Sequence, residues 1–347
     1  MNQFLFCLAG CWLLVPSAFA WDYESHRLVN QLALASLPKD FPAFALTSAA
    51  KERIAFLAGE ADRWRNSNED PFKNASSPDH YFDMDDLALF GLKPETISPF
   101  RYDFSAQLAS ARALHPTNFP PIEAAKDHDH TRALLGFLPW AINENYAKLK
   151  SEFSYLKAFE ELGTAEEIAN ARLNIVYTMG VMGHFVGDAT QPLHTTKHHH
   201  GWVGENPDHY ATNFTFHAWI DGGFIRRTGI KTETLLPKVR PARSLWTNAV
   251  TEVRPGSFSV ILNFVSEQHQ LVGPLYQLEK EHKLSPNNAG VSEGQKFISA
   301  QLLKAGQMLG DLWWSAWREA SPDKYLHNEL LKRKAAADAA SGNSPTR

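Results

Sequence analysis

The feature that most constrains the fold is one long apolar stretch that begins at Thr164 and ends before Pro192. Thr164 and Glu167 have the three-residue spacing of a capping box, which starts a helix. Proline has no backbone N–H to donate, so Pro192 ends it. The pattern therefore predicts a central helix. Its apolar positions recur at helical spacing, at Ile168, Ala171, Ile175, Val176, Met179 and Met182.

Glycines and further helical patterns extend this prediction to the rest of the chain. Gly180, Gly183 and Gly187 lie along one side of the predicted helix, where a missing Cβ lets another backbone approach closely. No run of alternating strand segments and no internal repeat is found. We therefore expect an all-α fold with one mainly helical domain over residues 21–334, followed by a flexible tail over 335–347. Similar helical patterns fit residues near 41–65, 104–114, 141–162, 258–283 and 292–320.

The first twenty residues have the pattern of an export signal. They carry no charged side chain, they are largely apolar, and they close in Ala18-Phe19-Ala20, a small-x-small cleavage site before Trp21. A short membrane anchor is a weaker alternative, because the apolar run falls short of the roughly 20 residues that span a bilayer. Lipoprotein cleavage before Cys11 would leave an apolar tail on the mature chain. We expect a secreted or periplasmic protein.

Charge and cysteine content limit the kind of site the chain can build. The formal net charge is −4, so any nucleic acid or phospholipid must be bound locally and not by a broad basic surface. Both cysteines, Cys7 and Cys11, lie in the expected signal. The mature chain therefore has no disulfide and no thiolate ligand for a metal.

Two His–Asp pairs carry the chemical signal. His184–Asp188 and His217–Asp221 have i, i+4 spacing, which on a helix places imidazole and carboxylate on one face. Asp188 falls near a helix C-terminus, where the macrodipole disfavours a carboxylate and calls for a nearby cation. One such pair would more often be a buried histidine beside a capping aspartate. Two pairs plus His194 within about forty residues indicate a metal site with His and Asp ligands.

Five segments resemble the S1/P1 nuclease family, which shares its α-helical fold and trinuclear zinc site with the bacterial zinc-dependent phospholipases C. The eleven-residue run from His184 to His194 is very specific. The absence of cysteine from the mature chain differs from the disulfide-bearing fungal and plant members and suggests a bacterial relative. The remaining segments follow the family's order: Trp21 to His26, Ala61 to Arg65, His80 to Asp83, and His217 to Asp221.

The resemblance implies three Zn²⁺ ions, one of which uses the mature N-terminus. Cleavage directly before Trp21 would create an α-amino group with a pKa of about 8, from which a metal easily displaces a proton. Amine and carbonyl of one residue also close a five-membered chelate. The three implied ligand groups are Asp62, His80, His184 and Asp188; His194, His217 and Asp221; and His26, a bridging Asp188, and the amine and carbonyl of Trp21.

The same resemblance implies roles around the metals. Asp83 would orient or deprotonate the attacking water, and Arg65 would contact the phosphate. Tyr81 could line a base or headgroup pocket, although a buried core aromatic fits the sequence equally well. The clear Gly-Gly-Asn stretch of the eukaryotic nucleases is missing, so Asn206 and Asn213 are the candidates for a phosphate-binding asparagine. Three zinc ions and three aspartates would leave a net positive charge, which favours a phosphate substrate.

The expected activity is hydrolysis of single-stranded DNA or RNA to 5′-phosphorylated products. Two features favour a nuclease: His26 lies five residues after Trp21, and Asp221 stands where the phospholipases carry Glu. Phospholipid headgroup hydrolysis by a zinc-dependent phospholipase C is the alternative. A zinc-binding protein without catalysis would not need Asp83 and Arg65. No obligate protein partner is predicted.

Two other motifs carry weaker signals. The sequence from Gly290 to Gly294 matches the G-x-S-x-G nucleophile elbow, but a polar loop precedes it where that motif requires a buried strand. Ser292 is better interpreted as a helix N-cap. Residues 197–211 contain three consecutive histidines, His198 to His200, and we expect a solvated surface loop there.

Overall fold

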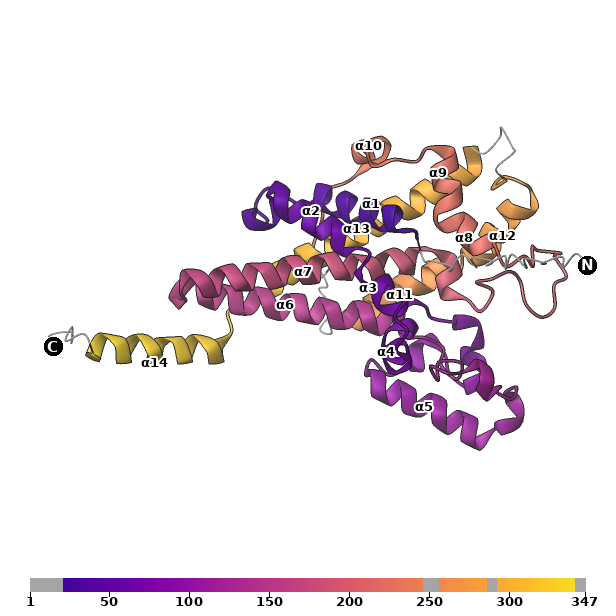
Figure 1. The fold of residues 1–347 in the computed structure, drawn as a ribbon, viewed down its shortest axis with the longest axis horizontal. Coiled ribbons are helices and arrows are strands. Elements are labelled where there is room, and N and C mark those ends of the chain that lie inside the picture. Colours follow the sequence, from indigo (N-terminus) through magenta and orange to yellow (C-terminus); the bar gives the residue numbers. More distant parts are fainter. Residues whose placement is uncertain (1–20, 246–255, 286–291, 341–347) are drawn as a thin grey trace, which may run out of the picture.

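The computed structural model describes residues 21–245, 256–285 and 292–340 (Figure 1). Helices make up most of these residues, and no strand occurs among them. The all-α fold predicted from the sequence is confirmed. The export signal predicted over residues 1–20 lies outside the described residues.

Helix α7 (Ala165–Thr190) lies at the centre of the fold. The Thr164 hydroxyl accepts a hydrogen bond from the N–H of Glu167 at 3.2 Å, and the Glu167 carboxylate accepts one from the N–H of Thr164 at 2.8 Å, so the predicted capping box is present. Every residue from Thr178 to Thr190 is buried. The helices that pack against α7 are α1 (Tyr23–Ser36), α2 (Ser48–Leu57), α6 (Leu138–Leu162) and α13 (Ser292–Glu319), and Figure 1 shows α6 running beside it.

The glycines of α7 allow the close packing that the sequence predicts. A Cβ atom at Gly180 would lie 2.5 Å from a leucine Cβ of α2. One at Gly183 would lie 1.7 Å from Asn30 Oδ1, and one at Gly187 would lie 2.8 Å from His26 Nδ1, both on α1. Real Cβ atoms do not make such short contacts, so α1 and α2 can dock here only because these positions are glycine.

Two of the expected helices are interrupted. The region 41–65 forms three helical segments, and the region 258–283 forms two. In the second case Pro274 lies in the first turn of the new helix, where its missing N–H leaves no hydrogen bond unmade. The same proline could not lie inside the preceding helix, so that helix ends before it. The segments are η1 (Ala43–Leu46), α2 and α3 (Glu60–Arg65) in the first region, and α11 (Ser257–His269) and α12 (Val272–Lys280) in the second.

Ser292 is helical and lies in the first described turn of α13. Residues 286–291, which include the start of the G-x-S-x-G match, lie outside the described residues.

Shorter elements complete the fold. The α-helices among them are α4 (Asp70–Ser76), α5 (Arg101–Leu114), α8 (Phe216–Ala218), α9 (Phe224–Thr228) and α10 (Thr232–Leu235), with a π-helical turn η8 (Trp219–Gly223). The 3₁₀ turns are η2 (Ser77–His80), η3 (Met84–Phe90), η4 (Pro94–Thr96), η5 (Pro116–Asn118), η6 (Ala124–Lys126), η7 (Pro192–Thr195) and η9 (Leu236–Lys238).

The last helix, α14 (Lys324–Ala340), projects from the body of the protein (Figure 1). Leu330 is its one buried residue, and Arg333 makes a two-pronged ion pair with Glu167 of α7 at 2.7 and 2.9 Å. The expected flexible tail is thus helical over residues 335–340, because alanine-rich sequence favours helix. None of the helices described here is long and apolar enough to cross a membrane.

The C-terminal end of α7 is held by buried polar contacts. Gln301 Nε2 of α13 donates to the carbonyl of Thr190 at 2.6 Å, which is one of the carbonyls that a helix end leaves without an internal partner. The Thr190 hydroxyl donates to the carbonyl of Gly187 at 2.8 Å. These contacts fix the last turns of α7, which carry His184 and Asp188.

The interface between α6 and α7 contains a carboxyl group whose ionisation should affect stability. Thr178 Oγ1 donates to Glu152 Oε1 at 2.7 Å, while Oε2 is buried without a hydrogen-bond partner. Burial raises the pKa of Glu152 to about 7 from an ordinary value of 4.5. The folded state therefore binds more protons than the unfolded state between these two values, so stability falls as the pH rises through this window.

Glu152→Gln removes this ionisation, and its effect on stability should depend on pH. We expect the free energy of unfolding of the variant, relative to the unmodified protein, to rise by about 1–2 kcal/mol between pH 5 and pH 8, after allowing for partial solvent screening. Urea unfolding at the two pH values measures this difference. Glu95→Gln, at an exposed site, is the control. A difference that is the same at both pH values would contradict the prediction.

Candidate metal centre

The last turns of α7 place the first His–Asp pair in the interior. His184 Nδ1 donates to the carbonyl of Ala58 at 2.7 Å, which leaves Nε2 to face the carboxylates of Asp188 (3.3 Å) and Asp62 (3.8 Å). A backbone carbonyl that fixes one ring nitrogen and presents the other is the usual support of a metal-binding histidine. His184 and Asp188 are both fully buried.

Asp188 lies at the centre of three histidines from three elements. Its Oδ1 lies 3.3 Å from His26 Nε2 of α1. Its Oδ2 lies 3.0 Å from His80 Nδ1 of η2 and 3.3 Å from His184 Nε2. Burial alone would raise the pKa of Asp188, but the surrounding histidines hold it well below its ordinary value. The two carboxylate oxygens thus face two different groups of histidines, as a bridging ligand requires.

A second group forms where the chain leaves α7. His194 Nδ1 donates to the carbonyl of His80 at 2.6 Å, and its Nε2 lies 3.0 Å from His217 Nε2. His217 Nε2 lies 3.1 Å from Asp221 Oδ2. The other oxygen of Asp221 accepts a hydrogen bond from Gln191 Nε2 at 2.6 Å. Gln191, which lies in the run from His184 to His194 but was not expected to act at the site, thus fixes the orientation of Asp221.

The second His–Asp pair lies on a π-helical turn and not on the regular α-helix that its spacing suggests. His217 is in α8 and Asp221 in η8. Because the π turn shifts the backbone pairing, the Asp221 carbonyl accepts from the N–H of Asp22 at 3.0 Å and from the Ser25 hydroxyl at 3.2 Å. A Cβ atom at Gly222 would lie 2.1 Å from the Asp22 carboxylate. The turn and its glycine thus join the start of α1 to the centre.

Trp21 lies directly beside these ligands. Its side chain is fully buried, and its indole N–H donates to the carbonyl of Gly187 at 2.9 Å. The next residue, Asp22, is bonded through its N–H to the carbonyl of Asp221. The backbone at position 21 is therefore held between the two segments that carry Asp188 and Asp221, where the resemblance to the S1/P1 nucleases implies a terminal ligand.

The buried His/Asp clusters can hold metal ions. They form three groups in which the potential ligand atoms all lie within 4.8 Å of one another. Buried polar atoms are almost always hydrogen-bonded, yet several atoms here make no hydrogen bond: both ring nitrogens of His26, Nε2 of His80, Nδ1 of His217, and one oxygen each of Asp188 and Asp221. A cation between His26 Nε2 and Asp188, and another between His217 Nε2 and Asp221, would satisfy the unbonded oxygens of both carboxylates. The groups are His26–His184–Asp188, Asp62–His80–His184 and His194–His217–Asp221.

Protonation of four of the five histidines also fits cation binding. Burial lowers the pKa of His26, His194 and His217, and it lowers that of His80 to about 4. Neutral imidazole is the form that binds a metal. Burial also raises the pKa of Asp221 well above its ordinary value, so its carboxylate requires a compensating positive charge.

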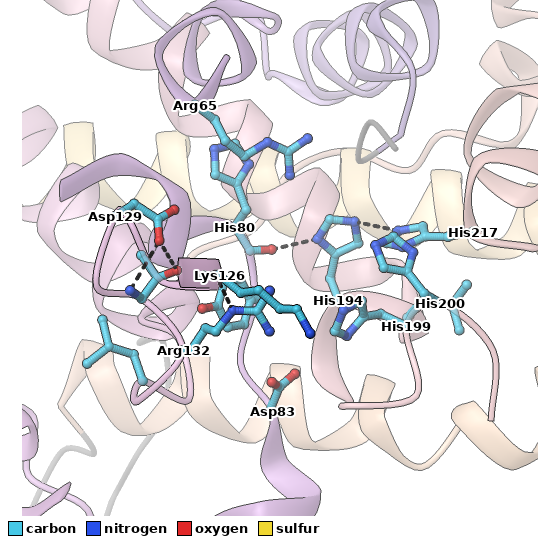
Figure 2. A pocket seen from close by; sticks show the side chains of 14 residues that line it. Arg65, His80, Asp83, Lys126, Asp129, Arg132, His194, His199, His200 and His217 are labelled. Carbon is cyan, nitrogen blue, oxygen red and sulfur yellow. Dashed lines mark hydrogen bonds between the residues drawn. The ribbon is translucent and has the colours of Figure 1, made fainter. Parts of the chain in front are cut away.

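One face of the centre opens into a cavity of about 510 Å³, called cavity A (Figure 2). His80, His194 and His217 line it, together with three residues expected around the metals, Arg65, Tyr81 and Asp83. Arg65 makes an ion pair with Asp62 at 2.9 Å. Burial and the neighbouring aspartates raise the pKa of Asp83 to about 8, and its Oδ1 makes no hydrogen bond. Asp83 can therefore accept or hold a proton near neutral pH.

The two asparagines proposed from the sequence do not lie in this cavity. Neither Asn206 nor Asn213 is among the residues that line it. Asn206 Nδ2 donates to the carbonyl of Tyr210 at 2.9 Å, and its Oδ1 accepts from the Tyr210 N–H at 2.8 Å, so its amide closes a turn. Asn213 Oδ1 accepts from the Thr215 hydroxyl at 3.1 Å. The geometry offers no support for a phosphate contact by either residue.

The expectation of a solvated loop is confirmed for most of residues 203–209, which are exposed, but it was wrong for His198 to His200. His198 is buried, and its ring stacks on Trp202 with ring centroids 3.9 Å apart. His199 and His200 line cavity A. The loop folds back tightly at Gly201, whose φ of 101° favours glycine and whose Cβ would lie 2.5 Å from the backbone of Thr212. This long-range contact had no sequence signal.

Four further residues of cavity A were missed. Lys126, Asp129, Thr131 and Arg132 come from a segment without helical periodicity, and only its packing beside the metal centre places them there.

Searches with the sequence find no matching family model and no matching curated protein. Function is therefore inferred from the geometry of the centre and from the resemblance of its motifs.

Proposed function

We propose that this chain is an exported, zinc-dependent phosphodiesterase of the S1/P1 nuclease type that hydrolyses single-stranded nucleic acid. The observation that carries the proposal is the position of Asp188, whose two oxygens face different histidine groups directly beside a cavity that contains Arg65 and Asp83. A storage protein for zinc would need the ligands, but it would not need a cation and a proton acceptor in the adjoining cavity.

Each group of residues would have a separate role in phosphodiester hydrolysis. The three His/Asp groups, with the amine of Trp21, would hold three zinc ions. When bound, zinc neutralises phosphate charge and makes water more acidic. The Arg65 guanidinium would bind a phosphate oxygen, and the Asp83 carboxylate would orient the attacking water and take its proton. Tyr81 lies in the wall of cavity A, where its ring would lie against the group attached to the phosphate.

The mature protein should contain about three zinc ions per chain and should lose its phosphodiesterase activity in EDTA. Metal analysis of the purified protein, with assays on bis(p-nitrophenyl) phosphate, single-stranded DNA, RNA and phosphatidylcholine, tests this. Fully active protein with one zinc or none would exclude the trinuclear centre. Hydrolysis of phosphatidylcholine without hydrolysis of nucleic acid would assign the protein as a phospholipase C, and zinc binding without hydrolysis of any diester would assign a non-catalytic role.

A further inference from the structure

A second cavity adjoins cavity A and shares two cationic residues with it. This cavity, called cavity B, has a volume of about 240 Å³, and Arg112, Glu123, Lys126 and Arg132 are among the residues that line it. Lys126 and Arg132 line cavity A as well. Cationic side chains therefore follow one another from Arg65 beside the metal centre, past Lys126 and Arg132, to Arg112 at the far end.

Lys126 and Arg132 are positioned to bind an anion between the two cavities. Arg132 Nε donates to the Lys126 carbonyl at 2.5 Å, which fixes the side chain and leaves its terminal nitrogens for a ligand. Lys126 pairs with Glu123 at 2.7 Å, and these two side chains are 63% and 67% exposed. Such an exposed pair contributes little, so a phosphate can replace Glu123. In Figure 2 the Lys126 side chain extends toward His199 across the cavity.

Arg112 is held as a fixed cation at the end of cavity B. Its guanidinium lies 4.5 Å from the ring centroid of Phe119 and 5.4 Å from that of Phe90. Contact with aromatic faces stabilises a cation and restricts its orientation. The Nε atom of Arg112 is buried and makes no hydrogen bond. Arg112 also lines cavity B, so its guanidinium is placed to bind a phosphate oxygen there.

The carboxyl groups that line the two cavities, Asp83, Asp129 and Glu123, are fewer than the four cationic side chains. Asp129 Oδ1 accepts hydrogen bonds from the N–H and hydroxyl of Thr131, at 3.3 and 2.9 Å. Glu123 is engaged only in the exposed pair with Lys126. In a chain with a net charge of −4, four cationic side chains thus gather along one path that begins at the metal centre.

We propose that Lys126, Arg132 and Arg112 form a track that binds successive phosphates of a single-stranded nucleic acid whose scissile phosphate lies at the metal centre. This inference rests on the proposed function and specifies its substrate as a polymer. A phospholipid such as phosphatidylcholine presents a single phosphate and has none for the track. A nucleic acid strand presents one phosphate at every nucleotide, so each cation of the track can neutralise one.

The test compares the variant Arg112→Gln/Lys126→Gln/Arg132→Gln with a control in which three exposed cations far from both cavities are changed, Lys39→Gln/Lys51→Gln/Arg53→Gln. For an oligothymidylate of about twelve nucleotides, KM of the track variant should rise about 10- to 100-fold, with kcat within about twofold. The logarithmic salt dependence of kcat/KM should become shallower by about 0.7 per charge removed. Turnover of bis(p-nitrophenyl) phosphate, which has a single phosphate, should fall by much less than kcat/KM for the oligonucleotide.

Single variants and a binding measurement keep the result clear if the triple variant folds poorly. Lys126→Gln and Arg132→Gln should each raise KM for the oligonucleotide about three- to tenfold, and Arg112→Lys should keep most of the affinity. Fluorescence anisotropy of a labelled thymidine phosphorodithioate oligomer, which resists hydrolysis, reports binding to the holoenzyme independently of turnover. Weaker and less salt-dependent binding by the variants supports the track even if no diester is hydrolysed, in which case only the proposed function fails.

Two outcomes would overturn the track. If oligonucleotide KM, salt dependence and anisotropy are unchanged while bis(p-nitrophenyl) phosphate is hydrolysed, the proposed function stands and the track is wrong. If the variants lose hydrolysis of phosphatidylcholine vesicles as strongly as hydrolysis of the oligonucleotide, the cations serve the centre as a whole, and a polymer substrate is not specified.

Discussion

Asp188→Asn should remove more than one equivalent of zinc and lower phosphodiester turnover by at least about a thousandfold, whereas Asp221→Asn should remove about one equivalent and do less damage. The two oxygens of Asp188 face different histidine groups, so its amide would disturb two sites at once. Only one oxygen of Asp221 faces a histidine, His217, because the other accepts the hydrogen bond from Gln191.

Metal analysis and turnover of bis(p-nitrophenyl) phosphate measure this difference in the two variants. Circular dichroism verifies that both retain their helices. Asp40→Asn, at an exposed position, is the matched control and should keep full zinc and full activity. Equal zinc loss and equal residual activity in the Asp188 and Asp221 variants would argue against a bridging role for Asp188.

An uncleavable Gly-Ser extension before Trp21 should remove or displace one zinc and reduce turnover by at least about a hundredfold, while the fold survives. The extension converts the terminal amine to an amide, which donates poorly to a metal and cannot close the same chelate. The indole of Trp21 and the N–H of Asp22 hold this residue against Gly187 and Asp221, so the altered backbone stays at the centre and cannot simply move away.

Zinc content, circular dichroism, and turnover on single-stranded DNA and phosphatidylcholine compare the extended protein with one that begins at Trp21. The same extension added after Arg347 is the control, because the C-terminal helix α14 projects away from the body (Figure 1). Full zinc and full turnover in the extended protein would show that the terminal amine is not a ligand. N-terminal sequencing of the exported protein would separately decide between cleavage before Trp21 and lipoprotein cleavage before Cys11.

The parts of the centre that the sequence anticipated depend on local spacing. His184 and Asp188 lie one turn apart on a helix whose start is fixed by a capping box and whose end is fixed by proline, and helical periodicity holds wherever the helix packs. The i, i+4 spacing of His217 and Asp221 correctly predicted that these two side chains pair. It did not predict the backbone, which forms a π turn there and not a regular α-helix. That turn depends on contacts with Asp22 and Ser25, which are distant in sequence.

Most residues that line cavity A, in contrast, could not be predicted from local spacing. Lys126 and Arg132 lie in an irregular segment, and no periodic pattern predicts which surface such a segment packs against. His199 and His200 were expected in solvent, but the turn at Gly201 brings their loop against the centre. Asn206 had the residue type expected of a phosphate ligand, yet its amide is used within its own turn.

The sequence by itself determined the helical class of this protein, the position of α7, its glycine contacts and the two His–Asp pairs. Each of these follows from spacings of three or four residues, which a helix converts directly into shared faces. Only the tertiary structure decided that Asp188 faces three histidines from three elements, that Gln191 orients Asp221, and that cationic residues extend from the centre into cavity B. These depend on how distant segments pack together, which local periodicity does not encode.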